Sequence, residues 1–399
     1  MVSLFTQGSY LISGWAEIIP PSSICNSKPP LLITMSTTSA PPPPPATMSK
    51  PKAIPLVPIP TSCFDENHLP SVLHQPDPMT QEAERQARRR TCRFIEEAGG
   101  QRCLRLPRVA IATATVFFHR FYAKQAFQEH DRFEVAMACL LLAGKTEESP
   151  KKLDFVIREC WKLRRKAQQQ QLQNKLVSGG DSPNVGGMSP TNIMSSPSSS
   201  SGGDLHMKSD EFARLKERVL LLERVILHTI GFELSIDHPF KFLIDCAQGL
   251  SKKRLLEYNP TKKAKLVGKD GQPMGKPQQN NQLVQELAQN AISFANDSLH
   301  TSLCLQFSAQ QIAMACVYLS GTHAGIGPIV GKTWLDLLDG ISAEELTSIS
   351  VQILELVQSN RRGVDSGQFK AIRKDLDEMM KGGSGGGSSQ PDAKRQKVN

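Results

Sequence analysis

The sequence predicts an all-α protein built from two tandem helical modules, and the main observation is an internal repeat. Residues 133–144 and 310–321 share six residues at a constant offset of 177 positions. Each copy would be apolar on every side of a helix, so each is expected at the centre of a helical bundle. The shared residues are Ala136, Met137, Ala138, Cys139, Leu142 and Gly144, which recur as Ala313, Met314, Ala315, Cys316, Leu319 and Gly321.

Four further helices are expected around the first copy, which makes a five-helix module over residues 78–232. The first runs over residues 81–98, where a pair of glycines follows and ends it. The second begins at Pro107, because proline suits the first helical turn, and apolar residues recur along it every three or four positions. The fourth opens at Pro150, and the fifth covers residues 211–230 with one apolar stripe.

The second copy predicts a second five-helix module over residues 236–362. Its helices are expected at residues 238–250, 283–303, 309–319, a short one around Trp334, and 343–360. No strand pattern is recognised anywhere in the sequence, so the modules are expected to be all-α.

The remaining segments are polar or rich in proline, and we expect them not to fold. The arm at residues 1–77 holds 13 of the 27 prolines within its first 60 residues. Disordered or polar inserts are expected at about residues 172–207 and 251–281, because neither has enough apolar surface to offset the entropy of ordering. Residues 363–399 are expected to be a flexible tail.

The beginning of the chain does not resemble a membrane or secretion signal. Residues 1–19 have no basic flank and contain Gln, Gly, Ser and Glu among the apolar residues, so no signal peptide and no membrane contact are expected. Met1 and Met48 both remain candidates for the initiator methionine.

Composition argues against a metal or redox site. The nine cysteines stand singly, with no pair spaced as C-x-x-C, so neither a zinc ribbon nor a redox motif is supported, and a reducing compartment fits. His119 and His130 lie eleven residues apart without further ligands, so His119 is interpreted as a core or hydrogen-bonding histidine. No metal and no cofactor are expected.

No catalytic set of residues stands out either. Residues 325–333 resemble a phosphate-binding loop, but the motif requires glycine where the chain has Ile326, and Pro328 interrupts it. No Ser/His/Asp or Cys/His arrangement is recognised. We therefore expect a noncatalytic protein.

Positive charge is concentrated in two clusters of the first module. The formal net charge is +9, and the clusters are an arginine-rich stretch over residues 88–108 and a basic run at residues 162–166. Two interpretations stay open: a solvated basic face, or a contact with RNA or phosphate groups. No aromatic residues suited to base stacking interleave with the basic residues.

Several local strings resemble one family, the transcription-type cyclins of the T and K group, with plant-like cyclin T the most similar. The strings are residues 118–122, 142–152, 221–227 followed by 231–234, and 296–307. The resemblance covers about residues 80–250 and 282–360. It implies that the two modules are cyclin boxes and that the partner is a transcription-type cyclin-dependent Ser/Thr kinase, bound as a heterodimer. The resemblance also implies that the chain activates a transcription-elongation kinase of the P-TEFb type, which phosphorylates the C-terminal tail of RNA polymerase II.

The resemblance assigns kinase binding to Lys145 and Glu223. From position alone, Lys145 ends an apolar helix, where a cation also compensates the helix dipole. Glu223 falls on the shoulder of a buried stripe, where a carboxylate needs a partner. A pair between the two helices, offered to a partner helix, would satisfy both residues.

The repeat allows the two modules to be compared at these positions. At the offset of 177 the counterpart of Lys145 is Thr322, and the acidic pair Glu147 and Glu148 becomes Ala324 and Gly325. We therefore expect the first module to bind the kinase. The two glutamates are candidate kinase contacts, with a solvated acidic helix end as the alternative.

One aromatic residue at the end of the first module is a further candidate. Phe232 follows Gly231, and its position in the resembling family suggests an aromatic anchor in the interface, with core packing as the alternative.

Two signals lie in the segments expected to be unfolded. Lys394, Arg395 and Lys397 form a short nuclear import signal on a flexible tether, so a nuclear location is expected. Ser182, Ser189 and Ser196 each precede a proline and are candidate phosphorylation sites.

Two other functions remain open from the sequence. A general transcription factor like transcription factor IIB also uses two such modules to bind DNA, although that family carries a zinc ribbon that Cys25 and Cys63 cannot build. The other open function is that of a helical scaffold without a kinase partner.

Overall fold

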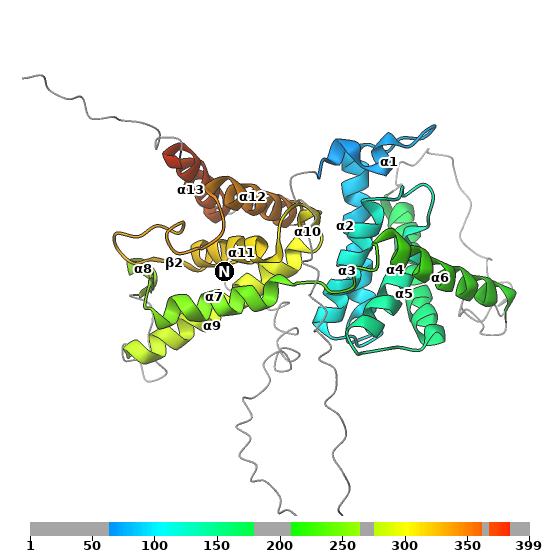
Figure 1. The fold of residues 1–399 in the computed structure, drawn as a ribbon, viewed down its shortest axis with the longest axis horizontal. Helices are drawn as coiled ribbons and strands as arrows, with labels where there is room; N and C mark the ends of the chain where they lie inside the picture. Colours follow the sequence, from blue (N-terminus) through cyan, green and yellow to red (C-terminus); the bar gives the residue numbers. More distant parts are fainter. Residues whose placement is uncertain (1–63, 179–208, 264–274, 361–366, 384–399) are drawn as a thin grey trace, which may run out of the picture. The chain divides into compact units, whose positions relative to one another are not determined.

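The computed structural model describes residues 64–178, 209–263, 275–360 and 367–383 of the 399-residue chain. These residues are almost entirely helical, so the predicted all-α class is confirmed (Figure 1). Among the described residues, none of the helices combines the length and the apolar character needed to cross a bilayer.

The first module is built around a fully buried central helix. Every residue of α4 from Val135 to Gly144 is buried, and α2, α3, α5 and α6 all contact it. Its elements are η3 (Glu66–His68), α1 (Pro70–Leu73), α2 (Gln81–Gly99), α3 (Arg108–Tyr122), α4 (Arg132–Thr146), α5 (Leu153–Ser178) and α6 (Asp210–Thr229). Side-chain caps start three of these helices, because the oxygens of Thr80, Asp131 and Ser209 accept otherwise unpaired backbone N–H groups.

The second module has the same kind of centre. The α11 helix is buried from Ile312 to Gly321, and it contacts α7, α9 and α12. The elements are α7 (Pro239–Lys252), β1 (Leu256–Tyr258), α8 (Pro260–Lys263), α9 (Lys276–Ser298), α10 (Leu303–Gln306), α11 (Ala309–Ala324), β2 (Ile326–Pro328), α12 (Ala343–Asn360) and α13 (Gly367–Gly383).

The short helix expected around Trp334 is absent, and the expectation was wrong. This segment is a series of turns, begun by a backbone hydrogen bond from Thr333 N to Asp336 Oδ2 (2.7 Å). Gly331 and Gly340, which flank it, have φ values of 85° and 82°, a conformation that continues no helix. The Trp334 indole instead packs directly on Gly321 of α11, where any larger residue would clash with it.

Parts of the segments expected to be unfolded are also structured. The strands β1 and β2 pair antiparallel, with Leu256 opposite Pro328, although no strand was expected. Three residues per strand are too few to give an alternating pattern. The strand β1 and the helix α8 lie inside the expected polar insert at 251–281.

Helices extend into the other polar segments as well. The α5 helix continues to Ser178, six residues beyond the start of the expected insert, because its Gln, Leu and Lys residues favour helix. In the expected tail, α13 buries Phe369, Ile372 and Leu376, which recur at helical spacing and pack with α12. In the expected N-terminal arm, Leu69 is buried beside α1.

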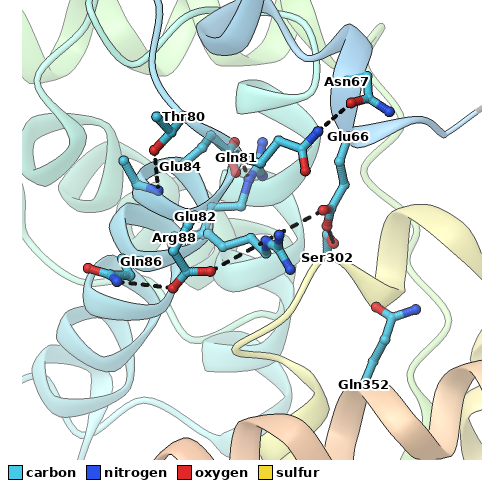
Figure 2. A network of polar contacts seen from close by, with 12 residues as sticks. Glu66, Asn67, Thr80, Gln81, Glu82, Glu84, Gln86, Arg88, Ser302 and Gln352 are labelled. Carbon is cyan, nitrogen blue, oxygen red and sulfur yellow. Dashed lines mark hydrogen bonds and ion pairs between the residues drawn. The ribbon is translucent and has the colours of Figure 1, made fainter.

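Direct contacts join the two modules. Ala112 and Val116 of α3 belong to the same apolar cluster as the core of the second module. Polar contacts continue this interface, because Ser302 Oγ donates to Glu66 Oε1 at 3.4 Å, as Figure 2 shows. Glu96 of α2 also contacts Arg108 Nη1 at 3.0 Å and His300 Nε2 at 3.2 Å. Burial opposes ionisation of Glu96, but the hydrogen bond and charge of His300 and the charge of Arg108 outweigh it and lower its pKa to about 2.

A buried arginine organises the carboxyl end of α3. Arg88 and Glu84 form an ion pair of 2.6 Å, with both side chains only 2% exposed (Figure 2). The guanidinium of Arg88 also donates to the carbonyl of Tyr122 (2.8 Å) at the helix end and to that of His119 (3.2 Å), which accepts from Ala123 N as well. His119 Nδ1 faces Arg88 at 3.2 Å, and His119 Nε2 donates to Leu299 O of the second module at 2.9 Å.

Candidate functional site

Lys145 and Glu223 lie together at the carboxyl end of α4. The distance from Lys145 Nζ to Glu223 Oε1 is 2.6 Å, which joins α4 to α6. The Lys145 side chain is 51% exposed, whereas that of Glu223 is 10% exposed. The carboxylate is therefore held at the edge of the core, while its cation remains accessible from solvent. Such a charged pair can orient a partner helix through backbone carbonyls and N–H groups.

The turn that follows Lys145 is strained. Ser149 N donates to Gly144 O at 2.8 Å, and Glu147 N donates to Ala143 O at 2.9 Å, which closes the helix. Glu148 has φ of 52°, a left-handed conformation that costs a non-glycine residue about 1 kcal/mol. Its counterpart at the offset of 177 is Gly325, with φ of 65°. Both modules thus end their central helix in the same way, but only the first places an exposed carboxylate there.

Glu147 points into the fold. Thr113 Oγ1 donates to Glu147 Oε1 at 2.7 Å, and His238 Nε2 lies 2.8 Å from the same hydroxyl. Because Thr113 has one hydroxyl hydrogen, His238 must donate to it. Burial lowers the pKa of His238, so it acts as a neutral donor. These two hydrogen bonds through the Thr113 hydroxyl link α3, the turn after α4 and the start of α7.

Phe232 lies outside the core. Its side chain is among the large exposed apolar residues, 59% accessible, and the centroid of its ring lies 5.1 Å from that of His228 in a T-shaped arrangement. Gly231 and Phe232 have φ values of 69° and 58°, so two successive left-handed residues end α6. The core-packing alternative for Phe232 does not match this position.

Further apolar side chains of α5 and α6 are exposed, and the sequence reasoning missed them. Leu220 and Leu221 of α6 are 40% and 53% exposed, and Phe155 of α5 is 36% exposed. Lys216 pairs with Asp154 at 2.7 Å, which places Phe155 near the helical turn before Leu220. Three consecutive leucines at 220–222 cannot all face one core, and this was the available signal. We call Lys145, Glu223 and Leu220, which lies three residues before Glu223 on the same side of α6, the α4–α6 face.

The second module closes the equivalent helix end internally. Lys262 of α8 donates to Ala324 O at 2.6 Å and also pairs with Glu286 of α9. Thr322, the counterpart of Lys145, donates to Tyr318 O at 3.0 Å within its own helix. At the end of α11, the position equivalent to Lys145 therefore carries a hydroxyl that bonds within its own helix instead of a cation.

The other predicted residues give no second site. His119 is fully buried, and burial with the charge of Arg88 lowers its pKa to about 3, so it is a neutral hydrogen-bonding residue. Within the described ranges no three metal-ligating side chains cluster. The nuclear import residues Lys394, Arg395 and Lys397 and the candidate phosphorylation sites Ser182, Ser189 and Ser196 lie outside the described residues.

Comparison with known proteins identifies the family. Residues 62–180 match the model of the cyclin N-terminal domain. Cyclin-T1-3 of Oryza sativa is 32% identical over 279 residues, covering 69% of this chain and 43% of the relative. Human Cyclin-K is 30% identical over 305 residues, covering 75% and 40%. The chain is a cyclin of the T and K group.

The similarity has definite limits. This cyclin spans 43% and 40% of the lengths of these two relatives. Among solved structures, a yeast RNA polymerase II CTD kinase complex aligns with a TM-score of 0.49 and 16% identity, covering 79% of this chain and 81% of that one. A likeness of this size does not bear on function.

Proposed function

We propose that this cyclin is a noncatalytic subunit that binds and activates a transcription-type cyclin-dependent Ser/Thr kinase. Activation of a protein kinase requires its Lys–Glu ion pair and metal-binding Asp to fall into place, which depends on the position of its αC helix. The cyclin would supply a rigid surface against which that helix packs.

The observation that carries the proposal is the Lys145–Glu223 pair, whose lysine is accessible, with the exposed Leu220 one turn away on α6. Isolated exposed leucines are ordinary, but Leu220 stands beside a charged pair that joins two helices. Apolar side chains would bury area against the kinase helix, and the charged pair would fix its register. Glu148 adds an exposed carboxylate, whereas Glu147 positions the turn through Thr113.

The finer assignment follows from the family. As a member of the T and K group, the chain would act in transcription elongation in the nucleus, and the substrate would be the C-terminal tail of RNA polymerase II. The basic tail residues 394, 395 and 397 would provide nuclear import.

The test compares two ion pairs that join the same two helices. Lys145→Glu places two carboxylates at the α4–α6 face, and we expect kinase affinity to fall at least about 30-fold, equivalent to about 2 kcal/mol. Arg218→Glu is the matched control, because Arg218 pairs with Glu134 at 2.7 Å between α6 and α4 and is 52% exposed. It lies at the opposite end of α4 and should leave kinase binding unchanged.

The readout is copurification of the full chain with a nuclear Ser/Thr kinase, identified by mass spectrometry, and activity on heptad-repeat peptides. Retention of duplex DNA without any kinase would favour a transcription factor IIB-like role instead. Full kinase binding by Lys145→Glu, with unchanged far-UV circular dichroism, would remove the α4–α6 face from the proposal.

A further inference from the structure

Three arginines meet at the amino end of α4, far from the α4–α6 face. Arg132 begins α4, Arg90 comes from α2 and Arg164 from α5. The guanidinium carbons of Arg132 and Arg164 lie 5.0 Å and 4.6 Å from the centroid of the Phe133 ring. We call Arg90, Arg132 and Arg164 the arginine cluster.

The neighbouring carboxylate, that of Asp131, already accepts four hydrogen bonds. Its Oδ1 accepts from the backbone N–H groups of Phe133 (2.9 Å) and Glu134 (3.1 Å) and from Arg164 Nη1 (3.2 Å). Its Oδ2 accepts from Arg164 Nη2 at 3.0 Å. Asp131 is therefore engaged with the start of α4 and with Arg164, and it makes no hydrogen bond to Arg132.

The next carboxylate is also engaged. Both oxygens of Glu134 bind Arg218, at 2.9 Å from Nε and 2.7 Å from Nη2. This bidentate geometry leaves Glu134 directed toward α6 rather than toward the arginine cluster.

Arg132 and Arg90 therefore keep uncompensated charge. Arg132 is half-buried and has neither hydrogen bond nor ion pair to any described residue. Burial, the charge of Arg90 and, to a smaller extent, that of Arg164 lower the pKa of Arg132, against the opposing effect of Asp131. Arg90 has one weak contact, to Gln86 Oε1 at 3.4 Å. Arg132, half-buried and close enough to Arg90 to be affected by its charge, has no carboxylate hydrogen-bonded to it among the described residues, so an added anion would stabilise it.

We propose that the arginine cluster binds the phosphate of a phosphorylated serine or threonine on a partner protein. A phosphate monoester carries a charge of about −1.5 to −2 and three acceptor oxygens, which suits planar guanidinium donors converging from different helices. The free amino end of α4 adds a favourable dipole, although Asp131 occupies its first N–H groups.

A compact phosphate fits this surface better than a nucleic acid strand does. The guanidinium groups of Arg132 and Arg164 lie over a single ring, at one position, which suits one compact anion. The one ring at the cluster, Phe133, is covered by guanidinium groups and packs edge-on with Phe94 at 5.1 Å, so it offers no free face for base stacking.

The phosphate site is separate from the proposed kinase face. Twelve residues of α4 lie between Arg132 and Lys145, which puts the two about 20 Å apart along the helix. A phosphoprotein could therefore be held while a kinase occupies the other end, and the inference does not depend on the proposed function.

The test is fluorescence anisotropy with the full-length chain and a labelled peptide carrying one phosphoserine followed by proline. We expect the phosphopeptide to bind at least about tenfold more tightly than its unphosphorylated form, and inorganic phosphate to compete. Arg132→Gln and Arg90→Gln should each weaken binding at least about fivefold, and Arg132→Lys should weaken it less than Arg132→Gln. Arg102→Gln, an exposed arginine at the end of the α2 segment, is the matched control and should change affinity less than about twofold.

Far-UV circular dichroism and thermal melting would show that each variant is folded. Equal affinity for both peptides, or equal loss with Arg102→Gln, would overturn the inference. It would also be overturned if single-stranded RNA bound more tightly than the phosphopeptide and lost that binding in Arg132→Gln.

Discussion

His119 should make the stability of this cyclin depend on pH in the mildly acidic range. It is fully buried between Arg88 and Leu299 O, and its pKa is lowered from 6.5 to about 3, first by burial and then by the charge of Arg88. A neutral His119 fits this position, because its Nε2 donates to a carbonyl and its Nδ1 faces a cationic donor.

The direction follows from where the proton binds. Between pH 6.5 and pH 3 the unfolded chain takes up a proton on this histidine, while the folded chain does not. The free energy of unfolding therefore falls as the pH drops below 6.5. With the two pKa values above, the loss between pH 7 and pH 5 is about 2 kcal/mol.

The assay is urea unfolding at pH 7, 6 and 5, comparing the native chain with His119→Gln. The glutamine variant should be less stable at pH 7, but its stability should fall by about 2 kcal/mol less on acidification. The other titratable groups, including Glu96, are present in both proteins, so their contributions to the pH dependence of the unfolding free energy cancel in the comparison. His68→Gln is the control, since that side chain is 76% exposed. A difference under about 0.5 kcal/mol between the pH dependences would refute the reasoning.

Two further predictions concern stability. Glu148→Gly removes left-handed strain but increases the conformational freedom of the unfolded chain, so it should be neutral or stabilise the protein by up to about 1 kcal/mol. Gly325→Ala should destabilise the protein by about 1 kcal/mol. A destabilised Glu148→Gly or a stabilised Gly325→Ala in thermal melts would contradict this. Phe369→Ala should cost about 3 kcal/mol or more in urea unfolding, because this α13 side chain is 2% exposed, and a loss under about 1 kcal/mol would show that α13 is not part of the core.

The central helices could be predicted because their sequences are apolar in every direction. Such segments have one stable location, the middle of a bundle, so α4 and α11 were found from composition and repetition alone. The α13 helix was missed although Phe369, Ile372 and Leu376 have helical spacing, because the glycine-rich sequence around it dominated the interpretation. The turns at Trp334 replace a helix because packing against Gly321 fixes the indole, and that contact between distant residues is invisible in the local pattern.

The candidate site was likewise predictable from the sequence only in part. Lys145 and Glu223 were assigned from the family resemblance, with their positions at a helix end and a helix shoulder in agreement, and the structure places them 2.6 Å apart. The inward direction of Glu147 depends on Thr113 and His238, which only the tertiary fold brings together. The arginine cluster likewise needs three helices to meet, so the basic stretches in the sequence indicated a charged surface without showing which cations lack a partner.

The most direct test of the central claim is the kinase activity that copurifies with Lys145→Glu, measured beside Arg218→Glu on repeats of the RNA polymerase II tail. The account predicts that the Lys145 variant loses both kinase and activity, while the Arg218 variant keeps them. Equal activity in the two variants, at equal helicity, would contradict it.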